Sequence, residues 1–386
     1  MALSGNWNYP TSIRFGAGRI SELPQACSEL GIRRPLLVTD PLLSRLPICA
    51  STVQICEDAG LAVSLSDQCA RNPDGEDVAA GVAAFRAAGA DGVIAFGGGA
   101  ALDVAKAVAL MVGQDRPLWD FEDIGDNWTR VKTDGMAPCV AVPTTSGTGS
   151  EVGRASVIVD SASHTKKIIF HPNMLPGRVV ADPALTVSLP AGVTAAVGMD
   201  ALSHNLEAWC APGFHPQAVG IAAEGMRLIH RSLVDAVTQP EDLGARARMM
   251  CASLMGATAF QRGLGAMHAM AHPVGAVFDA HHGLINAVVM PYVLCRNREA
   301  IEQRMIRLAA YIGLAYPSFR AFLDWVLELR DTLAIPSDLS ALGVGVEDCE
   351  RLAAMAVRDP SAGSNPIALT EADYVDLFRK AVTGVL

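Results

Sequence analysis

The stretch "DGVIAFGGGAALDVAKAV", residues 91–108, decides which fold is expected for this chain. Its first half contains a short apolar run, and three glycines end that run before a segment of helical composition begins. A strand in a parallel sheet has this unbroken apolar character, because helices cover both faces of such a sheet. The stretch therefore predicts a strand, a tight glycine turn and a helix, which is the repeating unit of an α/β domain.

The same alternation continues on both sides of this stretch. Segments of helical composition at 50–60 and 75–90 lie between short apolar runs. These runs predict strands at 34–40, 62–67, 91–99, 139–145, 156–160, 166–170 and 177–182. We therefore expect a Rossmann-like α/β domain over residues 1–187, with ligands bound at the carboxyl ends of its strands.

The composition of the chain changes after residues 182–190. Few alternating β-type patterns follow, and long segments rich in Ala, Leu, Met, Glu and Arg take their place. These segments, with apolar residues three and four positions apart, include 218–237, 243–260, 297–314 and 321–333. That spacing is typical of amphipathic helices, so we expect an all-helical second domain over 188–386.

Charge and composition exclude several classes of protein. The net charge is −10 and no basic run is present, which argues against a nucleic-acid surface. No apolar stretch is long enough to span a membrane, and the first 20 residues lack the pattern of a signal peptide. The nine cysteines form no CxxC pair and are interpreted as reduced core residues. We expect a cytoplasmic protein with neither a nucleic acid nor a membrane as its partner.

Two loops that follow predicted strands suit a nucleotide. Glycines 97–99 allow the backbone to approach a pyrophosphate, and the helix that follows offers free N–H donors, although the spacing matches neither GxGxxG nor a P-loop. The second loop, "PTTSGTGSEV" (143–152), carries five hydroxyl groups that suit phosphate or ribose. Each loop alone is also compatible with a purely structural turn. Together they favour a nucleotide bound by Gly97, Gly98 and Gly99 and by the hydroxyl groups of the second loop, which belong to Thr144, Thr145, Ser146, Thr148 and Ser150.

Asp40 ends the predicted strand at 34–40. A carboxylate at this position accepts hydrogen bonds from both ribose hydroxyls of an adenosine and repels a 2′-phosphate, which favours NAD over NADP. The alternative is that Asp40 only caps the next turn of the chain.

Five of the nine histidines lie in two windows of the helical half. Asp200 and His204 are four residues apart, which places them on one face of a helix, and His268 and His272 have the same spacing. His281 and His282 follow shortly afterwards. A single buried histidine is more often hydrogen-bonded than ligating, but the concentration of imidazoles predicts a site for Fe²⁺ or Zn²⁺.

These motifs resemble those of the iron-containing (group III) alcohol dehydrogenases. The resemblance is carried by "GGGAALDVAK", "PTTSGTGSEV", "GMDALSHNLEAW" and "HAMAHPVGAVFDAHHG", in this order along nearly the whole chain. It implies a dinucleotide-binding α/β domain, a helical metal domain and a cleft between them. The metal ligands that it implies are Asp200, His204, His268 and His282. The NAD contacts that it implies are Asp40, Asn72, Gly97, Gly98, Gly99, Asp103, Thr144, Thr145, Thr148 and Lys167.

The reaction that follows is hydride transfer between a small alcohol, diol or hydroxyacid and nicotinamide, assisted by a Lewis-acidic ion. His272 is the candidate for proton transfer, with a role in orienting the metal site as the alternative; His281 matches no required position. A hydroxyacid–oxoacid transhydrogenase with tightly held NAD is an alternative function, and a non-catalytic nucleotide-binding protein is a remote one. We expect a homodimer or a higher homo-oligomer.

Overall fold

The structure is a computed structural model that describes Tyr9, residues 11–163 and residues 165–386. The chain divides into two compact units. One unit comprises Tyr9–Thr145 and Gly149–Val187, and the other comprises Ser146–Thr148 and Ser188–Leu386. The prediction that the chain has no signal peptide rests in part on residues 1–8 and 10, which lie outside the described residues. Whether each unit is an independent domain, with a boundary at 187/188, stays a prediction.

The first unit contains a parallel sheet. Its described strands run in the order β1-β8-β5-β4-β2-β3, and every neighbouring pair is parallel. The strands are β1 (Ser12–Phe15), β2 (Pro35–Val38), β3 (Ser64–Ser66), β4 (Gly92–Gly97), β5 (Cys139–Pro143) and β8 (Arg178–Ala181). Because β3 lies on one side of β2 and β4 on the other, the chain reverses its direction across the sheet between β2 and β4. Open α/β sheets bind ligands at such a point, outside the carboxyl ends of the strands.

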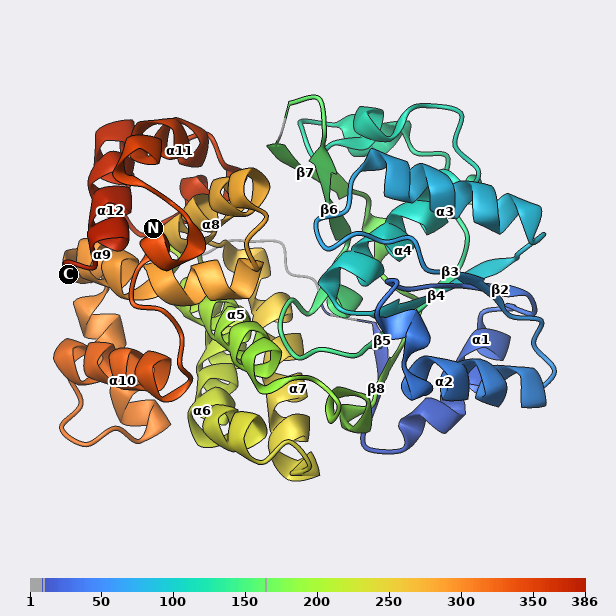
Figure 1. Ribbon diagram of the computed structural model, residues 1–386, viewed down its shortest axis with the longest axis horizontal. Helices are drawn as coiled ribbons and strands as arrows, with labels where there is room; N and C mark the ends of the chain where they lie inside the picture. Colours follow the sequence, from blue (N-terminus) through green and yellow to red (C-terminus); the bar gives the residue numbers. More distant parts are fainter. Residues whose placement is uncertain (1–8, 10, 164) are drawn as a thin grey trace. The chain divides into compact units, whose positions relative to one another are not determined.

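Helices cover both faces of this sheet (Figure 1). The helices of this unit are α1 (Leu23–Glu29), α2 (Pro47–Asp58), α3 (Gly75–Ala87) and α4 (Gly99–Met111). Side chains of α1 and α2 pack on one face, together with Leu37, Phe96 and Val142 of the central strands. Every residue of β2, β4 and β5 is buried, which explains the unbroken apolar runs in the sequence.

The predicted strands at 156–160 and 166–170 do not belong to the parallel sheet. They form β6 (Ala155–Asp160) and β7 (Thr165–Phe170), which pair antiparallel with each other and stand apart from the parallel sheet. The two strands are only partly buried, with partly and fully buried positions mixed along each. The sequence predicted strands here but did not predict how they pair.

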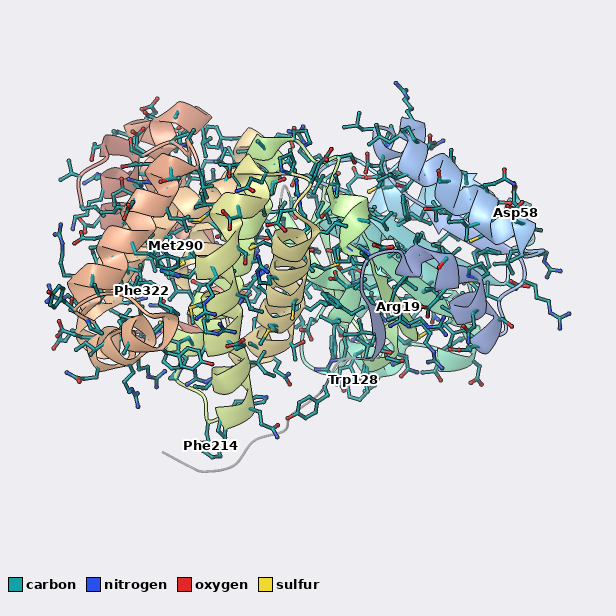
Figure 2. The ribbon with its side chains drawn as sticks, turned by 90° about the horizontal axis from the view of Figure 1, so that it is seen from below. Arg19, Asp58, Trp128, Phe214, Met290 and Phe322 are labelled. Atoms are coloured by element: carbon teal, nitrogen blue, oxygen red, sulfur yellow. The ribbon has the colours of Figure 1, made fainter. Side chains whose placement is uncertain are left out.

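The second unit is helical throughout its described residues. Its helices are α5 (Ala191–Cys210), α6 (Pro216–Thr238), α7 (Leu243–Ala259), α8 (Ala266–Phe278), α9 (His282–Ile312), α10 (Phe319–Thr332), α11 (Cys349–Ala356) and α12 (Glu371–Thr383). Met290 and Phe322 lie in the apolar core among these helices, whereas Asp58 of the other unit is exposed at the end of α2 (Figure 2). An α/β unit followed by a helical unit confirms the predicted fold class. Among the described helices, none is both long and apolar enough to cross a membrane.

Candidate active site

Helix α5 contributes three charged or titratable side chains from one face. Asp200, His204 and Glu207 occupy positions i, i+4 and i+7, so they stack along two turns of the helix. Their residues are only 2%, 5% and 5% exposed. Groups of this kind are rarely buried without a partner, because removing them from water costs free energy. This face of α5 is therefore the starting point of a polar site inside an apolar unit.

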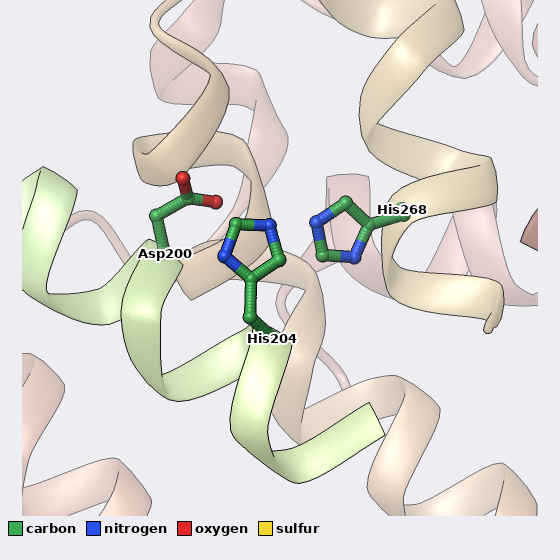
Figure 3. Close-up of side chains that lie close together, drawn as sticks. All are labelled: Asp200, His204 and His268. Carbon is green, nitrogen blue, oxygen red and sulfur yellow. The ribbon is translucent and has the colours of Figure 1, made fainter. Parts of the chain in front are cut away.

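Helix α8 adds His268, whose imidazole faces Asp200 and His204 (Figure 3). One potential ligand atom from each of these three residues lies within 4.8 Å of the others, and His268 is 1% exposed. Ligand atoms bound to one ion at about 2.0–2.2 Å are themselves about 3–4 Å apart. The carboxylate and the two imidazoles are thus grouped closely enough to hold one divalent ion.

His282 begins helix α9 next to this group. Its Nε2 lies 3.7 Å from Asp200 Oδ1, and its ring centroid lies 5.3 Å from that of His268. The following residue, Gly283, explains the approach: a Cβ there would lie 2.3 Å from Ala196 O and 2.9 Å from Asp200 Cβ. Only a residue without a side chain allows the start of α9 to pack this closely against α5. The assignment of Asp200, His204, His268 and His282 as metal ligands stays a prediction.

Each of the two deeply buried imidazoles has a hydrogen-bond partner that fixes its orientation. Glu207 Oε2 lies 2.6 Å from His268 Nδ1, while Glu207 Oε1 accepts a bond from the backbone N–H of Met267 at 2.7 Å. The carbonyl of Gly147 lies 3.3 Å from His204 Nδ1. If Nδ1 carries the proton in both rings, each Nε2 keeps its lone pair for a metal.

The protonation of the imidazoles agrees with this arrangement for His204. Burial, opposed chiefly by the charge of Asp200, lowers the pKa of His204 to about 4, so the ring is neutral at physiological pH. Burial also lowers the pKa of His268, but the carboxylate of Glu207 acts in the opposite direction and the net effect is upward. Glu207 therefore binds the Nδ1–H of His268 firmly in either protonation state.

His272 lies beside the group but has a partner of its own. Its Nδ1 is 2.7 Å from Asp359 Oδ2, and its ring stacks on that of His282 with centroids 5.4 Å apart and planes inclined by 13°. Burial raises the pKa of Asp359, but the neighbouring His272 and the hydrogen bonds of Ser361 lower it by a larger amount. The net pKa is therefore below its ordinary value, and the carboxyl is held ionised. With Asp359 on Nδ1, Nε2 is the other ring nitrogen of His272, and its predicted role in proton transfer stays a prediction.

The sequence analysis did not identify Glu207, Asp359 or a third residue, Asn286. A signal was present for two of them: Glu207 lies seven residues after Asp200, and Asn286 lies four residues after His282. Both spacings place the supporting residue on the same helical face as a predicted ligand. Asp359 is distant from His272 in the sequence, and only folding brings the two together.

In the α/β unit, the glycine turn and the threonine-rich loop lie side by side. Gly97 has a φ of 150°, and a Cβ on it would lie 2.8 Å from Ala101 Cβ. Its carbonyl accepts a hydrogen bond from Thr144 N at 2.9 Å. Gly98 is the N-cap of α4 and faces Thr145, whose Cγ2 would be 3.3 Å from an added Cβ. The turn therefore presents backbone N–H groups, including that of Gly99, close to threonine hydroxyls.

The other predicted NAD contacts have observed roles within the fold. Asp40 Oδ1 accepts hydrogen bonds from the backbone N–H groups of Leu42 and Leu43, each at 2.9 Å, so Asp40 does cap the turn after β2. Asp103 accepts bonds from Ser150 Oγ and from Val157 N. These contacts leave the predicted role in NAD binding untested for both residues.

Three more predicted contacts lie in different segments. Lys167 of β7 forms ion pairs with Asp160 at 3.0 Å and with Glu122 at 3.5 Å. Asn72 lies between β3 and α3, and Thr148 lies in the loop after β5; both are partly buried. Their contribution to NAD binding likewise stays a prediction.

A parallel sheet with a glycine turn at its switch point, followed by a helical unit with a buried carboxylate and imidazoles, defines a metal-dependent oxidoreductase. The family model for iron-containing alcohol dehydrogenase matches residues 10–183, and that for the C-terminal domain of the Fe-containing alcohol dehydrogenase family matches residues 194–382. The chain therefore belongs to the iron-containing alcohol dehydrogenase family, which confirms the resemblance found in the sequence.

Individual relatives cover almost the whole chain. It is 39% identical to 4-hydroxybutyrate dehydrogenase of Cupriavidus necator, over 97% of this chain and 99% of the relative. It is 33% identical to the NAD-dependent methanol dehydrogenase of Bacillus methanolicus, over 98% and 100%. Among solved structures, a 1,3-propanediol oxidoreductase superposes with a TM-score of 0.93 at 33% identity, covering 97% of this chain and 99% of the other.

Proposed function

We propose that this protein is a metal-dependent, NAD(H)-linked alcohol dehydrogenase that interconverts small alcohols, diols or hydroxyacids with their aldehydes. The observation that carries the proposal is the buried group of Asp200, His204 and His268, whose ligand atoms lie within 4.8 Å of one another. One carboxylate and several neutral imidazoles suit Fe²⁺, and Zn²⁺ as well. A divalent ion held there supplies Lewis acidity toward the oxygen of an alcohol or carbonyl group.

The chain itself supplies orientation and a path for a proton. Asp200, His204, His268 and His282 would hold the ion, with Glu207 and the carbonyl of Gly147 keeping two of the rings in place. Phe260, whose ring centroid lies 5.2 Å from that of His204, would form an apolar wall beside the ion. His272 is the proposed catalytic residue: Asp359 holds its Nδ1, so Nε2 accepts the proton that leaves the alcohol and returns it in the reverse direction.

For the cofactor, we propose NAD at the carboxyl ends of the strands. Asp40 follows β2 and Gly97–Gly99 follow β4, so these residues flank the point where the strand order reverses. Asp40 uses only Oδ1 in capping, and Oδ2 would serve the adenosine ribose. The remaining proposed contacts, given by the family resemblance, are Asn72, Asp103, Thr144, Thr145, Thr148 and Lys167. Hydride transfer is the cofactor's own chemistry, for which the chain supplies position.

We also propose a cytoplasmic location and a homodimer or higher homo-oligomer. All nine cysteines belong to the described residues, and each is a free thiol, which supports a reducing compartment. Burial raises the pKa of several of them, among them that of Cys56 to about 11, so these thiols stay protonated and unreactive. The oligomeric state rests on the family resemblance alone.

The test is to remove the metal and restore it. Protein treated with a chelator should not reduce NAD with any alcohol of a panel of primary alcohols, 1,3-propanediol and 4-hydroxybutyrate, and anaerobic addition of Fe²⁺ should restore NADH formation with at least one. Full activity in the metal-free protein would contradict the proposal. Turnover of a hydroxyacid and an oxoacid without added NAD would instead indicate the transhydrogenase.

A further inference from the structure

Asn286 is a buried polar residue that lies against the proposed metal ligands. It is located on α9, one helical turn after His282, and is fully buried. Packing does not explain why an asparagine is buried here, because an apolar residue would fill the same core position without the free-energy cost of removing a polar amide from water. Its neighbours indicate what the amide does.

The side-chain nitrogen of Asn286 contacts three proposed ligands at once. Nδ2 lies 2.9 Å from Asp200 Oδ1, 3.2 Å from His282 Nε2 and 3.3 Å from His268 Nε2. Its Oδ1 has no hydrogen-bond partner among the described residues. The opposite orientation of the amide would turn a carbonyl oxygen toward a carboxylate oxygen and two imidazole lone pairs, which repel it. The NH₂ group therefore belongs on the ligand side.

These contacts cannot persist when an ion is bound. A neutral imidazole nitrogen has one lone pair, which either accepts a hydrogen bond or binds a cation. The amide NH₂ is the positive end of a dipole and is repelled by a cation in the same place. Without the ion, however, the Asp200 carboxylate and the His268 imidazole are buried acceptors, and a buried acceptor without a donor is unfavourable.

We infer that Asn286 is a positioning residue that takes the place of the ion in the metal-free protein. The two N–H bonds of its NH₂ group are shared among Asp200, His268 and His282, keep these side chains in a ligating arrangement, and give up the imidazoles when the ion binds. This inference rests on the proposed metal site and deepens it, since it says how the ligands are held before the ion arrives.

The test compares thermal unfolding of the metal-free and the Zn²⁺-loaded protein for the wild type and Asn286→Leu. The leucine removes the donor at nearly constant size, so the metal-free form should lose several degrees in Tm and the loaded form much less. The increase in Tm on adding Zn²⁺ should therefore be larger in the variant than in the wild type. Equal losses in both forms, or a larger loss in the loaded form, would overturn the inference.

The matched control is Asn297→Leu, on the same helix. Asn297 is also buried, but its amide exchanges two hydrogen bonds of 2.9 Å with Asn365 and touches no proposed ligand. This substitution should lower both Tm values equally and leave the Zn²⁺-induced increase unchanged. An increase that grows in the control as it does in Asn286→Leu would show a general effect of destabilisation and would overturn the inference.

A second variant keeps the inference testable if Asn286→Leu does not fold. Asn286→Asp has the same shape but replaces the donor by an acceptor, so the metal-free form gains a repulsive contact and the loaded form gains an attractive one. The Zn²⁺-induced increase in Tm should exceed that of the wild type, and an increase no larger than the wild type's would overturn the inference. If Zn²⁺ and Fe²⁺ fail to stabilise the wild-type protein at all, the metal site itself is refuted.

Discussion

The proposed metal ligands on α5, α8 and α9 are side chains, whereas the strand ends of the α/β unit are built mainly from backbone. In the helical unit, Asp200, His204 and His268 point into one place, and Glu207 or Gly147 holds each ring by a hydrogen bond. In the α/β unit, Gly97 and Gly98 contribute no side chain, and a Cβ added to them would meet Ala101 and Thr145.

This difference teaches that the two regions respond to different kinds of substitution. A site made of side chains fails when an atom is removed, because each ligand supplies one bond that nothing nearby replaces. A site made of backbone fails when an atom is added, because its function depends on the close approach of a phosphate. The following substitutions test this contrast, from the largest expected effect to the smallest.

Replacing His268 by alanine removes a ligand and should have the largest effect. We expect bound metal to fall to background and the rate of NAD reduction to fall about a thousandfold or more, since the Lewis acid contributes several kcal/mol to the transition state. Metal analysis after reconstitution with Fe²⁺, together with circular dichroism, would separate loss of the ion from loss of the helices.

The control for this substitution is His230→Ala. His230 packs against Trp325 with ring centroids 5.2 Å apart and is a member of the helical unit outside the ligand group. It should retain its metal and its activity. Stoichiometric metal in the His268→Ala protein would contradict the proposed site.

Replacing Glu207 by glutamine keeps the shape of the side chain but changes what holds His268. An amide accepts only through its oxygen, so it cannot accept from both His268 Nδ1 and Met267 N as the carboxylate does. We expect affinity for Zn²⁺ to fall about 10–100-fold, as is typical when the partner of a metal-bound histidine is lost. Competition with a fluorescent chelator measures it.

A suitable control for that variant is Glu224→Gln, since Glu224 pairs with Arg227 on the surface of the same unit. Its affinity for Zn²⁺ should be unchanged. A Glu207→Gln protein that binds Zn²⁺ like the wild type would show that the carboxylate does not orient His268.

Adding one methyl group at Gly98 tests the backbone-built region. The new Cβ would lie 3.3 Å from Thr145 Cγ2, so the turn and the threonine must move apart and the approach to the N-terminus of α4 narrows. We expect KM for NAD to rise about tenfold, equivalent to about 1.4 kcal/mol, with metal content unchanged. Steady-state kinetics with varied NAD measure this.

Gly220→Ala provides the comparison for this change. Nothing lies within 4 Å of a Cβ at Gly220, which is inside α6, so the substitution should stabilise the protein slightly and leave KM for NAD as it is. An unchanged KM in Gly98→Ala would contradict the assignment of this turn to the cofactor.

The sequence predicted the fold well where local pattern and burial agree. The strands β2, β4 and β5 are buried on both faces and consist of apolar runs, and α6 and α10 bury residues three and four positions apart. Strand β1 was missed because Ser12–Phe15 is short, partly exposed and of mixed character. The pairing of β6 with β7 was missed because a strand pattern does not specify its partner.

In the candidate site, residue types in the sequence indicated which side chains would gather, but the sequence did not indicate which hydrogen bonds they would form. Asp200, His204 and His268 stand out because carboxylates and imidazoles are rare in apolar segments, and the structure brings them together. Asp359 was not identified, since its contact with His272 crosses 87 positions of the sequence. The capping of the turn by Asp40 was predicted only as the alternative to its role in NAD binding, which stays a prediction.

The unequal exposure of the histidines has a consequence for the kinetics of ion exchange. The side chains of Asp200 and His268 are 3% and 2% exposed, whereas that of His282 is 25% exposed. Solvent would reach an ion held by these side chains past the partly exposed His282. We therefore expect such an ion to exchange more slowly than one bound at an open surface, because Asp200 and His268 are shielded from solvent.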